Sequence, residues 1–393
     1  MRQPEVALRR GAEAEGVYGR LGVRRLVNAA GFHTIRGGSL MPAEVVAAMV
    51  EAARSYVRID DLLARAGERI AALTRNEAGF VTSGAGAGLL LATAACVAGK
   101  DPAKQRQLPD VTGLKGEVVV FRQHRNSHDH AVRQTGVRLR EIGYDQRATA
   151  AWELDAAIGA ETAAIVYFLN VFTPQPHAYP GHEGPLPLGE VIAIARRRGV
   201  PVIVDAAHNL PPVDRLWQYT RMGADLVVFS GGKELRGPQC TGLILGRTDL
   251  IEACAMQANP MAGIGRVAKV GKEEIAGLVA AVERYVALDH EAEARRREDV
   301  VAYLVDELGR LPHLATARVF PAHDMWEVPE ARITFQADGR GIGRDEVASR
   351  LAAGDPAAEG YPSGANGLLL CPATLEAGDA EVVVRRITEI VAE

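Results

Sequence analysis

Short apolar runs alternate with longer helical patterns over the first two thirds of the chain. The apolar runs are 79–83, 117–121, 137–142, 163–169, 200–205, 225–229 and 242–246. Several are apolar at consecutive positions, as in VVV and IVYF, which is typical of strands covered by helices on both faces. Helical patterns such as 84–98 and 187–198 lie between them. The repeated strand–helix–strand order predicts an α/β fold with a mostly parallel, seven-stranded sheet.

One pair of runs departs from that order. Only about a dozen residues separate 225–229 from 242–246, which is too few for an ordinary helical crossover. We therefore expect these two strands to be antiparallel neighbours.

The pattern changes after residue 262. A long helical pattern, 272–308, is rich in Glu and Arg and could join two domains. Beyond it, strand patterns alternate with helical ones, at 317–320, 331–336, 343–352, 367–370 and 378–391. We expect an N-terminal segment (1–50) that packs on the domains, a large domain (51–262) and a small C-terminal α+β domain (263–393).

Composition narrows the functional classes. The chain has 393 residues, 48% of them hydrophobic, and a formal net charge of −4. That charge argues against a protein whose main task is to hold nucleic acid on a basic face. The N-terminus lacks a signal-peptide core, and no stretch approaches the ~20 apolar residues that span a bilayer. The four cysteines (Cys96, Cys240, Cys254 and Cys371) match no CxxC or zinc spacing, so we expect a reduced, cytoplasmic protein.

Lys233 follows one of the predicted strands, in the segment SGGKE. A P-loop needs GxxxxGK[ST], but Val227 stands five residues before Gly232 and Glu234 follows the lysine, so that interpretation fails. A solvated surface charge remains one interpretation. The other rests on the small residues Ser230, Gly231 and Gly232, which let another molecule approach the backbone. A partly desolvated lysine at a strand end can lose its proton and form a Schiff base with a carbonyl cofactor.

Asp205 ends the strand 200–205, at the edge where open α/β sheets bind ligands. A single Asp at a strand end is common. Together with Lys233, 28 residues later, it could face the pyridine nitrogen of pyridoxal 5'-phosphate (PLP) and keep that nitrogen protonated.

The segment VTSGAGAG (81–88) leads from a strand into a helix. A dinucleotide fingerprint needs glycine at 84, 86 and 89, but Leu89 stands at the third position. The first turn of the helix nevertheless carries only small side chains, so its N–H groups could hold a phosphate. Tight packing of the helix on the sheet is the alternative explanation.

Three further candidates lie near strand ends. The segment 121–130 contains His124, His128 and His130, but no matching acidic or cysteine ligands for a metal. His124 is best placed to stack on a cofactor ring, unless the segment is only a solvated loop. Asn170 could donate to the phenolic oxygen of the cofactor, and His208 could face the substrate or cap its loop.

Several motifs together resemble the SelA-like family of fold-type I PLP-dependent enzymes. This group includes selenocysteine synthase and D-glucosaminate-6-phosphate ammonia-lyase. The motifs are SGGKELRGPQCTGLILGR, VDAAHNLPP, VTSGAGAGLLLATAACVAG and GRVAKVGKEEIAGLVAAVERY, and the similarity runs from about Asn28 to the last helix.

The resemblance implies a role for most of these residues. Lys233 would carry the Schiff base, and Asp205 would pair with the pyridine nitrogen. Ser83, Gly84, Ala85 and Ser230 would bind the phosphate, and the loop 123–125 would cover the ring. It also implies a homodimer or larger ring with active sites shared between subunits.

One segment departs from the family pattern. A GDPP-type segment followed by arginine is expected near the C-terminus, but this chain reads AAGDPAAEGYPSGANG, with Glu359 and Tyr361 in that region. A phosphosugar acid is therefore in doubt as substrate. Arg36, Arg266 and Arg332 are the candidates for binding a substrate carboxylate, and each could also be a structural charge.

We expect a PLP-dependent lyase that acts on a small amino acid or amino sugar acid, with Lys233, Asp205 and His208 as candidate catalytic residues. Transamination, racemisation or aldol cleavage would use the same lysine and aspartate. A tRNA-linked selenium transferase-like protein is the alternative from another class, and the missing N-terminal extension argues against it. A catalytically silent PLP-fold protein is the third alternative.

Overall fold

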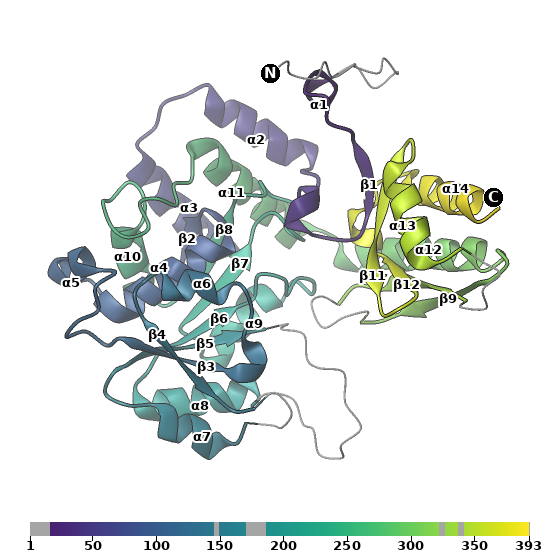
Figure 1. Ribbon diagram of the computed structural model, residues 1–393. Coiled ribbons are helices and arrows are strands. Elements are labelled where there is room, and N and C mark those ends of the chain that lie inside the picture. Colours follow the sequence, from purple (N-terminus) through teal and green to yellow (C-terminus); the bar gives the residue numbers. More distant parts are fainter. Residues whose placement is uncertain (1–15, 145–148, 170–185, 322–326, 337–341, 393) are drawn as a thin grey trace, which may run out of the picture. The chain divides into compact units, whose positions relative to one another are not determined.

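The protein is described here by a computed structural model covering residues 16–144, 149–169, 186–321, 327–336 and 342–392 (Figure 1). The chain forms two compact units. The larger comprises 32–293 and 323–327, and the smaller comprises 1–31, 294–322 and 328–393.

The larger unit is built on a seven-stranded sheet. Its strands are β2 (Ala78–Thr82), β3 (Glu117–Phe121), β4 (Arg138–Ile142), β5 (Thr162–Phe168), β6 (Val202–Asp205), β7 (Leu226–Ser230) and β8 (Gly242–Gly246). They lie in the order β2-β8-β7-β6-β5-β3-β4. Only β8 runs antiparallel to its neighbours, β2 and β7. The predicted mostly parallel sheet and the predicted antiparallel pair are both confirmed.

The larger unit also contains twelve helical segments among the described residues. In chain order they are η1 (Thr34–Arg36), α2 (Ala43–Ala53), α3 (Ile59–Leu73), α4 (Gly84–Ala98), α5 (Pro102–Gln107), η2 (Arg122–His124), α6 (Asp129–Arg133), α7 (Ala151–Ala157), α8 (Leu188–Arg198), α9 (Arg215–Met222), α10 (Thr248–Gln257) and α11 (Lys272–Ala287). Helix α4 crosses the sheet in contact with β5, β6, β7 and β8. It lies close because Gly88 has no side chain: a Cβ there would come 2.6 Å from Val228 Cγ1.

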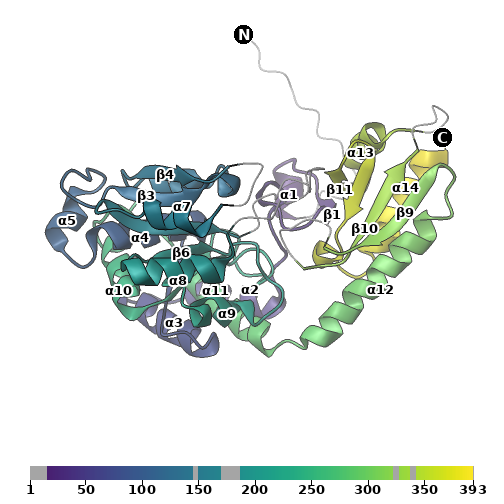
Figure 2. The ribbon, with the colours of Figure 1, turned by 90° about the horizontal axis from the view of Figure 1, so that it is seen from below.

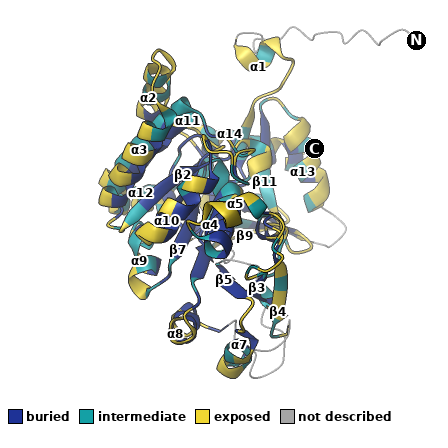
Figure 3. Cartoon of the chain, turned by 90° about the vertical axis from the view of Figure 1, so that its left-hand side faces the viewer, coloured by how far each residue is buried: buried dark blue, intermediate teal, exposed yellow. Residues whose placement is uncertain are grey.

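The strands of this sheet form the core of the larger unit. Every residue of β3, β5 and β6 is buried, and Figure 3 shows the sheet as a dark band between more exposed helices. Ile165, Ile203 and Phe229 are among the largest side chains that are completely buried. Each such side chain contributes about 1.5–3 kcal/mol to folding, which makes the strand ends a rigid base for a site.

The smaller unit has a five-stranded sheet in the order β1-β11-β12-β10-β9. Its strands are β1 (Leu26–Ala29), β9 (Leu314–Val319), β10 (Glu330–Phe335), β11 (Ala357–Ser363) and β12 (Gly367–Leu370), and its helical segments are α1 (Val17–Arg20), α12 (His290–Leu308), α13 (Arg344–Ala353), η3 (Pro372–Thr374) and α14 (Asp379–Ala392). Apolar side chains of α12, α13 and α14 form one core with the strands. Figure 2 shows the long helix α12 running beside this sheet. Strand β1 pairs in parallel with β11, so an N-terminal segment completes this sheet.

Two details differ from the expectations. The helical pattern 272–308 forms two helices, because Leu288 is extended and the Asp289 carboxylate accepts the Ala292 N–H at 2.9 Å, which starts α12 anew. The compact units also divide the chain at other residues than the expected 1–50, 51–262 and 263–393. Residues 16–31 belong with the C-terminal strands through β1, whereas 263–293 belong with the larger unit, where α11 packs on α2 and α3.

Among the described residues, no helix has the length and apolar character needed to cross a membrane.

Candidate active site

The carboxyl ends of three parallel strands bring the candidate residues together. Asp205 is the last residue of β6 and pairs in register with Phe168 of β5 and Val228 of β7. Lys233 lies three residues beyond the end of β7. A cavity of about 320 Å³ opens here, and its lining includes the predicted residues Gly84, Ala85, Asp205, His208, Ser230 and Lys233.

The turn that carries Lys233 is fixed by close backbone packing. Gly231 N–H donates to Thr241 O at 2.8 Å, and Gly237 N–H donates to Gly231 O at 2.8 Å. A Cβ on Gly231 would collide with the Thr241 hydroxyl, and one on Gly232 would collide with the backbone of Gln239. The two glycines therefore let the turn fold onto the segment before β8 and hold the lysine at the cavity.

The surroundings of Lys233 favour the uncharged form of its amine. Its side chain is half-buried, and loss of surrounding water lowers its pKa to about 7, although the negative charge of Asp205 acts in the opposite direction. At neutral pH a substantial fraction of the amine is uncharged, which is the form that attacks a carbonyl carbon.

The Asp205 carboxyl group is buried in the same cavity. Burial raises its pKa, while the Ala207 N–H and the positive charges of Lys233 and His128 partly offset that rise. The Ala207 N–H donates to Oδ1 at 3.0 Å. Because the carboxylate has little water around it, an additional cation placed beside it would be strongly favoured.

The start of α4 forms the third part of the cavity. Ser83 is the N-cap residue, but its side chain does not cap the helix, so the first N–H groups are left for another acceptor. Gly84 has a φ of 80°, a left-handed conformation that glycine adopts readily. A Cβ on Gly86 would meet no atom within 4 Å, so there is open space in front of this turn. Ser83 itself does not line the cavity, whereas Gly84, Ala85 and Gly86 do.

The two histidines of the loop after β3 have different surroundings. His124 is buried, and its ring lies 4.5 Å from that of Tyr167 in an edge-on contact. Burial lowers its pKa to about 4, and its Nδ1 has no hydrogen-bond partner among the described residues. His124 does not line the cavity, but His128, four residues later, does, together with Asn126 and Ser127.

The remaining predicted residues are not gathered at this cavity. Arg36 lies in η1 and Arg266 on an exposed loop of the larger unit, and neither lines the cavity. Arg332 lies on β10 of the smaller unit, where its Nε is buried without a hydrogen-bond partner among the described residues. Asn170 falls outside the described residues.

Sequence reasoning missed several residues of the lining. Thr34 and Gln239 both line it, and Gln239 Nε2 donates to Thr34 O at 2.9 Å. Nothing in the pattern around Thr34 indicates a site, because that residue precedes the larger unit's first strand by more than 40 positions. Asn126 could have been found, since Asn-Ser after a strand is a common turn signal.

The three parts of the cavity fit PLP. The uncapped turn at Gly84–Gly86 suits a phosphate, the buried Asp205 carboxylate suits a protonated pyridine nitrogen, and the uncharged amine of Lys233 suits an aldehyde.

Comparisons with known proteins agree with this assignment. The profile of the SelA family, described as L-seryl-tRNA selenium transferase, matches residues 26–308. A D-glucosaminate-6-phosphate ammonia lyase from Salmonella typhimurium is 31% identical over 380 residues, covering 95% of this chain and 97% of the relative. A 5'-C-glycyluridine monooxygenase-decarboxylase from a Streptomyces species is 34% identical over 380 residues, covering 95% and 91%.

A selenium transferase and two solved structures are also similar to this chain. An L-seryl-tRNA(Sec) selenium transferase from Desulfomicrobium baculatum is 30% identical, over 72% of this chain but only 60% of the relative. Among solved structures, a D-glucosaminate-6-phosphate ammonia-lyase superposes with a TM-score of 0.81 at 29% identity, covering 96% of this chain and 99% of that chain. A serine palmitoyltransferase from S. paucimobilis with bound PLP has a TM-score of 0.56 at 14% identity, covering 93% and 87%, and shares the fold.

Proposed function

The chain belongs to the SelA family and has the fold of fold-type I PLP-dependent enzymes, and from that premise we propose that it is a PLP-dependent lyase acting on a small amino acid or amino sugar acid. The observation that carries the proposal is the meeting of Lys233, Asp205 and the start of α4 on one cavity, in a chain that matches an ammonia lyase along almost its whole length.

We propose a binding residue for each part of the cofactor. Lys233 would attach to the aldehyde carbon, and Asp205 would pair with the pyridine nitrogen. Ser83, Gly84, Ala85 and Ser230 would hold the phosphate. His124 would lie against the ring, and Asn170, outside the described residues, would contact the phenolic oxygen. When bound, PLP supplies an electron sink that weakens the bonds at the α-carbon of an amino acid.

The chain's own residues would then move protons. Lys233 Nζ, with a pKa of about 7, can take a proton from the α-carbon at neutral pH and return it. Asp205 would stay ionised against the pyridine nitrogen. His208 also lines the cavity and would face the substrate near the group that leaves. Loss of water, followed by hydrolysis in which one water molecule replaces the amino group and ammonia leaves, would give a 2-oxo acid.

The partners follow from the same premise. We place the enzyme in the cytoplasm, since the four cysteines are free. We also expect a homo-oligomer with shared active sites. Exposed apolar side chains between residues 35 and 57 support the oligomer: Ile35, Leu40, Met41, Val46, Val50, Tyr56 and Val57.

Arg36, Arg266 and Arg332 remain the candidates for binding the carboxylate of the substrate.

A second candidate function is oxygen-dependent decarboxylation of an amino acid attached to a nucleoside. The match that favours it is the 34% identity to the glycyluridine monooxygenase-decarboxylase over 95% of this chain. Glu359 and Tyr361, in the region where an arginine was expected, also make a sugar phosphate a poorer fit. Aminotransferase, racemase and aldolase activities would use the same lysine and aspartate.

One experiment separates these functions. The purified protein with PLP is incubated with a panel of D- and L-amino acids, amino sugar acids and nucleoside amino acids. Ammonia, 2-oxo acid, carbon dioxide and oxygen uptake are measured together. The lyase predicts ammonia and 2-oxo acid without oxygen uptake or a keto-acid acceptor. Oxygen uptake with carbon dioxide release would favour the second candidate, and an absolute need for a keto acid would contradict the lyase.

A further inference from the structure

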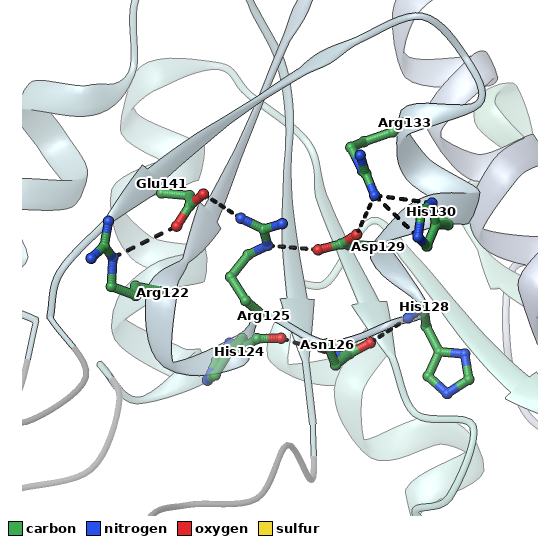
Figure 4. A network of polar contacts seen from close by, with 9 residues as sticks. All are labelled: Arg122, His124, Arg125, Asn126, His128, Asp129, His130, Arg133 and Glu141. Atoms are coloured by element: carbon green, nitrogen blue, oxygen red, sulfur yellow. Dashed lines mark hydrogen bonds and ion pairs between the residues drawn. The ribbon is translucent and has the colours of Figure 1, made fainter.

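The loop after β3 is fastened to the sheet by a chain of polar contacts. In Figure 4 the contacts run from Arg122 and Glu141 through Arg125 to Asp129 and Arg133. Arg125 bonds Glu141 of β4 and donates through Nε to Asp129 at 2.6 Å. The loop is therefore tied to the edge strand β4 as well as to β3, from which it leaves.

Within the loop, Asn126 fixes the backbone that carries His128. Its Nδ2 donates to His124 O at 3.0 Å, and its Oδ1 accepts the His128 N–H at 2.7 Å. Such an asparagine turn holds its own backbone without help from a helix or strand. The His128 side chain therefore projects from a fixed backbone position. In Figure 4 its ring points away from the ion pairs.

Asp129, the next residue, is a buried carboxylate. Its side chain is only 4% exposed, and besides Arg125 it forms an ion pair with Arg133 at 3.3 Å. Arg133 in turn contacts His130 Nδ1 at 2.9 Å. Removing one partner from a buried ion pair leaves an uncompensated charge, so these contacts hold the turn together as a unit.

His128 and Asp205 line the same cavity, although they come from different strand ends. Burial raises the pKa of the Asp205 carboxyl, and positive charge at His128, like that at Lys233, acts in the opposite direction. A positive charge on the wall of such a cavity interacts with a buried carboxylate more strongly than it would in water.

We propose that His128 keeps Asp205 in its charged form for the bound cofactor, and that Asp129 and Asn126 are positioning residues that hold His128 there. This inference rests on the proposed function, because it gives Asp205 the role of partner to the pyridine nitrogen. The other titratable groups that line the cavity with His128 are Asp205, His208 and Lys233. Those on its own segment are Arg125, Asp129, His130 and Arg133, and the His128 ring points away from their contacts in Figure 4.

Two double-mutant cycles test it, with the dissociation constant of PLP as the readout. We expect His128→Gln to weaken PLP binding about fivefold. The same substitution in an Asp205→Asn background should change binding less than about twofold, because the charge it supports is gone. Asp129→Asn should weaken binding about threefold, and should add nothing once His128 is glutamine.

Glu298→Gln, which removes a surface partner of Arg318 in the smaller unit, serves as the control for losing an ion pair. The thermal midpoint of each variant separates loss of folding from loss of binding. Effects that simply add in both cycles, or a His128→Gln protein that binds PLP like the wild type, would overturn the inference. A wild-type protein that does not bind PLP would instead refute the proposed function.

Discussion

Two lysines of the larger unit are partly removed from water, and their surroundings differ. Lys272, the first residue of α11, is 19% exposed at its side chain; its Nζ donates to Ala52 O at 2.7 Å and bonds the adjacent Glu273. Lys233 follows β7 at a cavity and has the buried Asp205 as its charged neighbour. The first lysine is satisfied locally and links α2 to α11. The second keeps its amine available beside open space. Burial alone therefore does not make a lysine reactive; the position of its partners does.

The comparison is tested most severely by removing each amine in turn. Lys233→Ala should lower turnover of the amino acid found in the panel on the order of 10³-fold or more, since no other group would take its place. Lys272→Met should retain turnover within about threefold, because the residue serves only packing and hydrogen bonds. Steady-state rates with saturating PLP give both values. Equal losses of turnover in the two variants would contradict the distinction between a reactive Lys233 and a structural Lys272.

Removing the charge of Asp205 should have the next largest effect. A charge-assisted hydrogen bond to the pyridine nitrogen is worth about 3 kcal/mol, so Asp205→Asn should lower kcat about 10²-fold. Asp249→Asn, an exposed carboxylate paired with Arg247, is the control and should leave kcat unchanged. An Asp205→Asn enzyme as active as this control would show that the Lys233 site works without its buried partner.

Filling the space in front of α4 should weaken cofactor binding. Gly86→Val would place a branched side chain where a Cβ now meets no atom within 4 Å, so the fold should tolerate it while the phosphate loses its place. We expect PLP affinity to fall on the order of 10-fold. Gly343→Val is matched, since Gly343 also has open space and precedes a helix, α13, in the smaller unit. Titration of both variants with PLP gives the two affinities. Equal affinities would contradict the assignment of the first turn of α4 as the phosphate site.

The smallest effect concerns stability without cofactor. Lys233 has a pKa of about 7 in the folded protein against an ordinary value of 10.5, so between these pH values only the unfolded chain holds the proton. The cost of burying the charged amine is therefore full below pH 7 and declines as pH rises toward 10.5. Lys233→Met should stabilise the apoprotein by on the order of 2 kcal/mol at pH 6, and by less at pH 10.

Urea unfolding of the apoprotein at both pH values provides that comparison. Lys272→Met should instead destabilise by about 1 kcal/mol at pH 6, since it loses hydrogen bonds. A Lys233→Met protein less stable than the wild type at pH 6 would contradict the account of Lys233 as a desolvated amine.

The strand-end residues could be predicted from sequence because each directly follows an apolar run. Asp205 ends β6, Gly84 starts α4 after β2, and Lys233 follows β7, so parallel pairing alone brings them to one edge. The same reasoning predicted that β8 is antiparallel, because the connection from β7 to β8 is too short for the helical crossover that a parallel pair needs.

The remaining features depend on tertiary packing that no local pattern encodes. Strand β1 joins β11 more than 300 residues later, and Thr34 reaches the cavity through its contact with Gln239. The ion pairs that hold His128 involve Glu141, on a different strand from the loop they fasten. Long-range pairings of this kind are fixed by the assembled sheet rather than by the periodicity of any one segment.

The central claim is that Lys233, rather than any other lysine, attaches to the cofactor. Incubation of the wild-type protein with PLP, reduction with borohydride and peptide mapping by mass spectrometry would locate the attached group. The account predicts one pyridoxyl group per chain, on the peptide that contains Lys233, and none on the peptide that contains Lys272. Attachment at Lys272 or spread over several lysines, with Lys233 unmodified, would contradict it.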